Sequence, residues 1–293
     1  MTVDDRLLYE TRVRPRQAVV AGLAGTMLVV AAIIQLSGPH TTIDELTLDL
    51  ITAHRRFPLD VVGAVINALG ALALAGTLAF LVSTARARNP KTQPFIRILA
   101  ILGGVAAAIT GVAYAVVIAV KADQFVSAGS QTYEQANHLT STSAILVLQL
   151  IGQAAALVLA VGFVLTSMSA MRVGLLTRFM GYLGIFAGVL VLFPIGSPVP
   201  VVQGFWLLAL GYMLSGRWPT GVPTSWRSGR AEKWPSSQEL REQRAAKAGG
   251  RRAGASNGSE RGKPAPSPAP EAVSAPPTRA RTNTPKRKRK RRR

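Results

Sequence analysis

The sequence predicts an all-α, polytopic membrane protein with six transmembrane helices and a basic C-terminal tail. Of its 293 residues, 48% are hydrophobic and only 16% are charged, whereas soluble domains average about 25% charged residues. Residues 217–293 hold 21 of the 34 Lys and Arg residues but only 5 of the 14 Asp and Glu residues. The net charge of +20 is therefore concentrated behind an apolar body.

Six apolar segments precede residue 216, and a helix of about 20 apolar residues spans a bilayer core of about 30 Å. The predicted spans are residues 18–36, 61–84, 98–120, 143–166, 179–193 and 199–215. The last two are short, and we expect Arg178 to snorkel at the end of the fifth. The first segment is long for a signal peptide and lacks an A-x-A-like cleavage site, which favours a retained helix.

Polar connectors and basic turns alternate between the spans. The connector at residues 40–60 contains Thr42-Ile43-Asp44-Glu45, which matches a capping box. Apolar residues follow at helical spacing, so we expect a short helix on the membrane surface. The connector at residues 121–142 is also polar, and the turns at residues 85–97 and 168–178 are basic.

The distribution of basic residues predicts the orientation. If the N-terminus is cytoplasmic, the cytoplasmic segments carry 31 of the 34 basic residues, and the outer connectors carry only Arg55, Arg56 and Lys121. Basic residues accumulate on the cytoplasmic side of membrane proteins. The sequence therefore predicts that both termini are cytoplasmic.

Small residues predict close packing of the helices. Gly103, Ala107, Gly111 and Ala115 recur every fourth residue along the third span. Residues 184–188 form a Gly-x-x-x-Gly motif in the fifth span. Such ridges let helix backbones approach each other, and we expect this packing to occur within the chain.

Three regions follow from the composition: a transmembrane domain (residues 1–216), a juxtamembrane segment (217–252) and a tail (253–293). Trp218, Trp226 and Trp234 recur every eight residues beside basic residues. Because Trp favours the headgroup level, we expect the juxtamembrane segment to lie on the inner leaflet. The tail is rich in Pro, Ala and Ser, which predicts disorder.

The tail ends in eight consecutive basic residues: Lys286, Arg287, Lys288, Arg289, Lys290, Arg291, Arg292 and Arg293. Such a run binds polyanions, either anionic lipid headgroups or nucleic-acid phosphates. A solvated tail that only enforces the topology is the third interpretation.

Polar side chains within the spans are the candidate binding residues. They are Asn67, Thr110, Tyr114, Gln149, Gln153 and Gln203. At about 1.5 Å per residue, each lies in the outer half of the membrane. They predict an outward-facing pocket for a neutral ligand, formed by spans 2, 3, 4 and 6; hydrogen bonds that only join helices are the alternative.

Gln149 and Gln153 lie four residues apart and therefore share one face of the fourth span. An amide in hydrocarbon is costly without a hydrogen-bond partner. We therefore expect this face to turn toward protein or a wet cavity.

The sequence offers little support for catalysis. It contains no cysteine, and no Gly-x-Ser-x-Gly, P-loop or His-Glu-x-x-His motif. His40, His54 and His138 lie in the outer connectors, without the spacing of a zinc site. We therefore predict no catalytic residue, metal ligand or cofactor, and an enzyme is the less favoured class.

Two segments resemble a known family. MRVGLLTRFMGYLGIFAGVL (residues 171–190) and PVVQGFWLLALGYMLSGRWP (residues 200–219), followed by Trp234-Pro235, resemble a group of multi-pass membrane proteins of unknown function from actinobacteria. The resemblance implies a bacterial plasma-membrane protein and assigns no functional residue.

These observations predict an integral plasma-membrane protein that acts as a non-enzymatic binding or scaffold protein. Its basic tail would contact anionic lipid or nucleic acid. The alternative is a small-solute transporter that uses the outward-facing pocket. The oligomeric state is left open by the sequence.

Overall fold

The computed structural model describes residues 3–37, 46–127, 130–192, 200–219 and 221–232, which form helices and connections without a strand. They belong to one compact unit, which ends at Trp234. The predicted all-α class is confirmed for this part of the chain. The predicted disordered tail (residues 253–293) lies outside the described residues.

Four helices are long and apolar enough to cross a membrane: α1 (Val3–Leu36), α3 (Leu59–Arg88), α4 (Phe95–Ser127) and α6 (Ser143–Arg172). The predicted fifth and sixth spans correspond to α7 (Arg178–Leu192) and α8 (Val201–Leu214), of 15 and 14 residues. They are only about 22 and 21 Å long.

The long helices extend beyond the predicted spans, because a helix does not stop where its apolar residues stop. For example, α3 continues to Arg88 and ends at Asn89-Pro90. The helix predicted in the connector at residues 40–60 is α2 (Leu46–Arg56), but its capping box lies outside the described residues. α5 (Tyr133–Thr140) is an unpredicted helix, capped by the Thr132 side chain.

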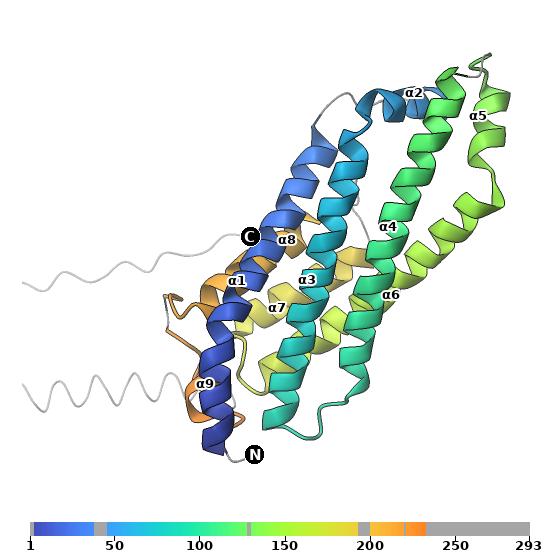
Figure 1. The fold of residues 1–293 in the computed structure, drawn as a ribbon. Coiled ribbons are helices and arrows are strands. Elements are labelled where there is room, and N and C mark those ends of the chain that lie inside the picture. Colours follow the sequence, from blue (N-terminus) through green and yellow to red (C-terminus); the bar gives the residue numbers. More distant parts are fainter. Residues whose placement is uncertain (1–2, 38–45, 128–129, 193–199, 220, 233–293) are drawn as a thin grey trace, which may run out of the picture. The chain divides into compact units, whose positions relative to one another are not determined.

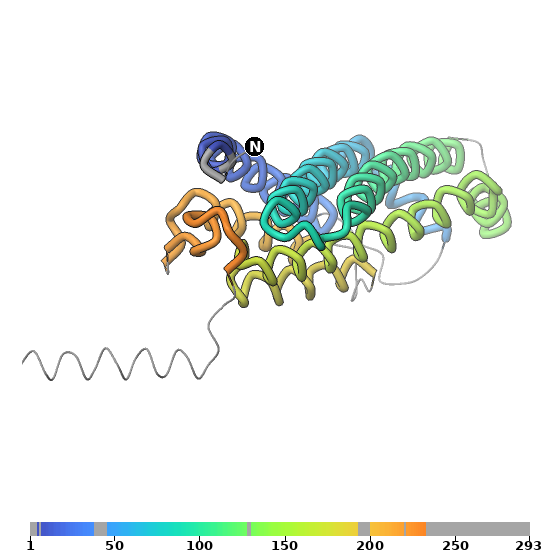
Figure 2. The backbone as a smooth tube through the Cα atoms, turned by 90° about the horizontal axis from the view of Figure 1, so that it is seen from below, coloured from blue at the N-terminus to red at the C-terminus, as the bar shows by residue number. Residues whose placement is uncertain are grey.

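The helices form two layers (Figures 1 and 2). α1, α3 and α4 lie side by side in one layer, and α8, α7 and α6 form the other. Contacts between α1 and α8 and between α4 and α6 close the layers into a ring. α2 and α5 lie at one end of this unit, called the α2 end, and α9 (Ser225–Ser228) lies at the other, called the α9 end.

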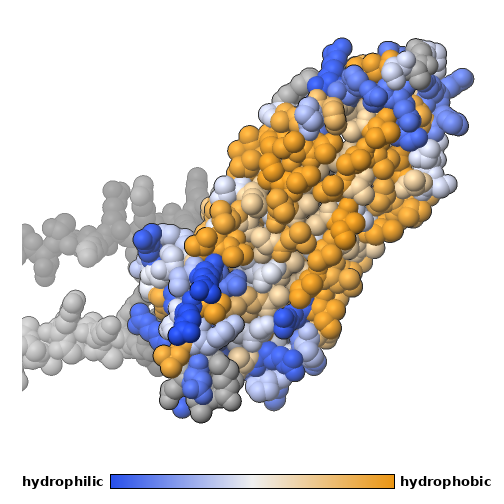
Figure 3. Space-filling model, in the orientation of Figure 1, coloured by the Kyte–Doolittle hydropathy of each residue, from blue (hydrophilic) through white to orange (hydrophobic). Residues whose placement is uncertain are grey.

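An apolar surface covers the middle of the unit. Figure 3 shows it as a band of hydrophobic residues between two polar ends. Exposed leucine, isoleucine and valine side chains on α1, α3, α4 and α6 form this band. Such a surface suits contact with lipid, because a soluble monomer rarely exposes an apolar patch of this extent.

Small residues set the distance between α4 and α6, as predicted. A Cβ on Gly103 would lie 2.5 Å from the backbone nitrogen of Leu159, and one on Gly162 would lie 2.9 Å from that of Ala100. The other half of the predicted ridge does not pack in this way, because Gly111 has no atom within 4 Å of an added Cβ.

The two glycines of α4 give a matched test of this packing. We expect Gly103→Ala to lower the free energy of unfolding by about 1–3 kcal/mol, because its methyl group would collide with the α6 backbone. Gly111→Ala should be neutral or stabilising by up to about 1 kcal/mol, since alanine favours a helix. Unfolding of each variant in detergent measures the difference, and equal effects would contradict the close contact.

Candidate functional site

A buried ion pair between α1 and α3 organises the α9 end. Arg88 donates two hydrogen bonds to the Glu10 carboxylate, one of them 2.8 Å long from Nη1 to Oε1. The same guanidinium donates to the carbonyl oxygens of Thr84 and Ser225, at 3.1 Å each. The Arg88 and Glu10 side chains are only 0% and 6% exposed. The two charges therefore neutralise each other away from solvent.

Trp226 packs against this ion pair. The Arg88 and Arg14 guanidinium groups lie 5.2 and 5.6 Å from its ring centroid, at distances typical of cation–π contacts. Its indole nitrogen donates a 2.9 Å hydrogen bond to the Leu175 carbonyl. Trp226 is thus buried in the protein. The expectation that this segment lies at the headgroup level stays a prediction.

The segment around α9 is folded so that the Ser225 carbonyl meets Arg88. Hydrogen bonds from the hydroxyl groups of Thr224 and Ser228 lower the pKa of the Glu232 carboxyl group. Glu232 is therefore ionised near neutral pH. The compact unit thus includes the first part of the predicted juxtamembrane segment.

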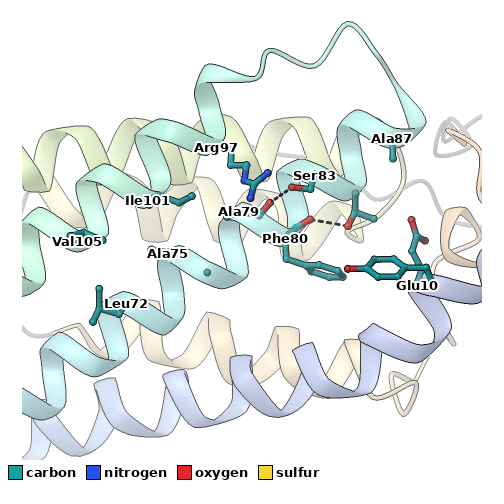
Figure 4. A pocket seen from close by; sticks show the side chains of 13 residues that line it. Glu10, Leu72, Ala75, Ala79, Phe80, Ser83, Ala87, Arg97, Ile101 and Val105 are labelled. Atoms are coloured by element: carbon teal, nitrogen blue, oxygen red, sulfur yellow. Dashed lines mark hydrogen bonds between the residues drawn. The ribbon is translucent and has the colours of Figure 1, made fainter. Parts of the chain in front are cut away.

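A groove of about 680 Å³ opens between α3 and α4, next to the ion pair (Figure 4). We call it the α3–α4 groove. It is lined by Tyr9, Glu10, Leu72, Ala75, Gly76, Ala79, Phe80, Ser83, Thr84, Ala87, Arg97, Ile101 and Val105. Its length along α3 is about 22 Å. Apolar residues line most of that length, and polar residues are confined to the α9 end.

Arg97 carries the uncompensated charge of the groove. Its side chain is exposed, and none of the described residues forms an ion pair or side-chain hydrogen bond with it. Figure 4 shows Arg97 beside Ser83, whose hydroxyl donates to the Ala79 carbonyl at 2.8 Å. A smaller adjoining cavity of about 320 Å³ is lined by both Arg97 and Arg86. This end of the groove is therefore positively charged.

A second cavity, of about 620 Å³, lies at the α2 end between α2, α3 and α4. Its rim is fixed by Arg56, which donates to Asp60 at 2.8 Å and to the carbonyl oxygens of Ser37 and Ile34 at 2.8 and 2.9 Å. Alanine and glycine residues of α4, including Gly111, line the wall. The small residues that do not pack against a helix thus leave space for this cavity.

The structure brings only part of the predicted site together. Asn67 and Tyr114 line the cavity at the α2 end. Thr110 is buried and donates to the Ala106 carbonyl of its own helix at 2.8 Å. Gln203 is also buried, and its amide donates to the Ala187 carbonyl at 3.0 Å, so it joins α8 to α7. These two residues have a packing role.

Gln149 and Gln153 lie elsewhere, on an exposed face of α6. Neither lines a cavity described above. The eight basic residues at positions 286–293 lie outside the described residues.

Comparison with protein-family models, curated proteins and solved structures finds no match for this chain. The site must therefore be interpreted from its own chemistry. His54 and Asp123 lie 3.7 Å apart at the α2 end. Over the described ranges, however, no group of three His, Asp or Glu residues could hold a metal ion.

Glu10, Arg88 and Arg97 were not identified from the sequence. Glu10 is an ordinary acidic residue of a polar segment, and Arg88 and Arg97 belong to a basic turn. Glu10 and Arg88 are 78 residues apart, so no local spacing indicates their pairing. The only available signal was Asn89-Pro90, which ends α3 and therefore places Arg88 in its last turn.

The ion pair can be tested by removing one or both charges. Glu10→Leu leaves Arg88 buried and unpaired, and we expect it to lower the free energy of unfolding by about 3–5 kcal/mol. The double variant Glu10→Leu/Arg88→Met should lose less stability than Glu10→Leu, because neither charge then remains without its partner. Chemical unfolding in detergent measures both.

Arg12→Gln is the control, since Arg12 is an exposed residue of the same helix. It should be close to neutral. The single variant Arg88→Met is measured alongside. A double variant that loses as much stability as the sum of Glu10→Leu and Arg88→Met would show that the two charges are not coupled.

Proposed function

We propose that this chain is a non-enzymatic, multi-pass protein of a bacterial plasma membrane that binds anionic phospholipid of the inner leaflet. The α3–α4 groove is the single observation that carries the proposal. An acyl chain would lie along its apolar walls, and the phosphate would meet Arg97 at its charged end. Basic pockets between helices on the cytoplasmic side are known to bind such headgroups.

The proposal includes six spans, with both termini in the cytoplasm. The basic residues near the α9 end support this orientation by the positive-inside rule. α7 and α8 are short for a span, but local thinning of the bilayer accommodates a short apolar helix at a modest free-energy cost. The basic tip at residues 286–293 would then face the same anionic leaflet as the groove.

Variants of the groove test lipid binding. We expect Arg97→Gln to weaken binding of phosphatidylglycerol about fivefold, because one basic residue near an anionic surface contributes about 1 kcal/mol. Gly76→Leu should also weaken it, since an added Cβ at Gly76 meets no atom within 4 Å and the side chain can fill the groove. Native mass spectrometry of the purified chain with added lipid measures occupancy.

Lys91→Gln serves as the charge control, because Lys91 is exposed and does not line the groove. Equal binding of phosphatidylcholine and phosphatidylglycerol would contradict the proposal. Deleting residues 286–293 should weaken association with anionic vesicles and leave occupancy of the groove unchanged. Stronger binding of the tail to nucleic acid than to vesicles would identify a different partner for it.

The orientation gives a further prediction, since the chain has no native cysteine. In intact cells, a membrane-impermeant maleimide should label Asn137→Cys on α5 and should not label Arg230→Cys near α9. Ser197→Cys, between α7 and α8, should also be labelled if these helices complete two spans. Labelling of Arg230→Cys but not of Asn137→Cys in intact cells would indicate the opposite topology. Permeabilised cells, in which both cysteines should be labelled, provide the control.

A transporter is the second candidate, favoured by the cavity at the α2 end. Asn67 supplies an amide and Tyr114 a phenol to that cavity, which a small neutral solute could use. In this case Asn67→Leu would reduce uptake into proteoliposomes while leaving lipid occupancy of the α3–α4 groove unchanged.

A further inference from the structure

Two amide side chains project from α6 at the level of the apolar band. Gln149 and Gln153 are exposed, and neither forms a hydrogen bond with a described residue. They lie about 9 and 15 Å from the start of the helix at Ser143. If α6 crosses the bilayer, both amides face hydrocarbon, where a polar group without a hydrogen bond costs several kcal/mol.

The length of α7 explains why this face of α6 is open. Gly181, Gly184 and Gly188 of α7 pack against α6 over the stretch from Met171 to Ala160. α7 ends at Leu192, only one turn beyond Gly188. The half of α6 near the α2 end packs against α4, where Gly152 faces Thr110. In Figure 1 this half runs along the edge of the unit toward α5.

The exposed face has the pattern of a helix–helix seam. Leu146, Leu150, Gln153 and Leu157 follow one another at intervals of four, three and four residues, and all are exposed. Spacing that alternates between three and four residues is that of a coiled-coil stripe. Most membrane helix pairs pack in this geometry, with polar side chains hydrogen-bonded across the interface.

We infer that this face of α6, from Leu146 to Leu157, binds the same face of a second copy of the chain. Two copies in one membrane share their orientation, so a twofold axis runs along the membrane normal. The axis places Gln153, which belongs to the stripe, opposite Gln153 of the second copy, whereas Gln149 lies at the edge of the stripe beside Leu150. An amide both donates and accepts hydrogen bonds, and the Gln153 pair is therefore self-complementary.

Lipid cannot replace the second copy, because acyl chains neither donate nor accept hydrogen bonds. The inference depends on α6 crossing the bilayer and is independent of lipid binding in the α3–α4 groove. A dimer would leave that groove accessible, since its lining residues belong to α1, α3 and α4.

The first experiment measures dimerisation of the full chain in reconstituted bilayers by energy transfer between labelled copies. Gln149→Leu/Gln153→Leu should weaken the dimer on the order of tenfold, since the variant loses the hydrogen bonds that the amides form across the interface. Thr26→Val is the control. It removes an exposed polar group from α1 whose hydroxyl already donates to the Gly22 carbonyl at 3.0 Å.

The second experiment locates the interface by cysteine cross-linking. Leu150→Cys should form an intermolecular disulfide under mild oxidation, whereas Leu23→Cys on α1 should not. The two leucines are similarly exposed, at 62% and 55%, so exposure alone cannot explain a difference. A monomeric wild type in the bilayer, equal cross-linking at both positions, or a double Leu variant that dimerises as strongly as the wild type would each overturn the inference.

Discussion

Hydrocarbon supplies no hydrogen bonds, so the polar groups of this chain must find their partners within the protein. Most of the described ones do so locally. The hydroxyl groups of Thr77, Thr84 and Thr166 donate to the carbonyl four residues earlier. Trp206 and Gln203 instead donate to carbonyl groups of α7. The same requirement draws attention to the two amides of α6, because both are exposed and neither forms a hydrogen bond with a described residue.

Much of the fold could be predicted, because hydrophobicity and helix length are local properties of a sequence. All six apolar segments correspond to helices, and the helix expected in the first polar connector is α2. The extent of each long helix was less predictable, since charged residues such as Arg88 continue the helix once a tertiary partner neutralises them. That partner, Glu10, lies in another helix, and sequence spacing carries no information about it.

The candidate site could be predicted less well, because the depth of a side chain and the direction in which it points are determined by different factors. Depth follows from the rise per residue, whereas the rotation of a helix is set by its packing. The spacing correctly placed Gln149 and Gln153 on one face. Another face of α6 is turned toward α4 by the close contacts of Gly103 with Leu159 and of Gly162 with Ala100. Gln203 points inward because α8 is packed between α1 and α7. Residues predicted at similar depths therefore lie in three different environments: a cavity, a buried contact between helices and an exposed helix face.

The ion pair also determines the sign of the charge in the groove beside it. Glu10 and Arg97 both line the α3–α4 groove, and two isolated charges of opposite sign there would attract no anion. Arg88 binds both oxygens of the Glu10 carboxylate, which leaves Arg97 as the uncompensated charge. By pairing with Glu10, the inaccessible Arg88 would thus allow the accessible Arg97 to attract an anion. The Glu10–Arg88 ion pair also holds α1 to α3. The same ion pair would therefore stabilise the α9 end and favour an anionic lipid over a neutral one.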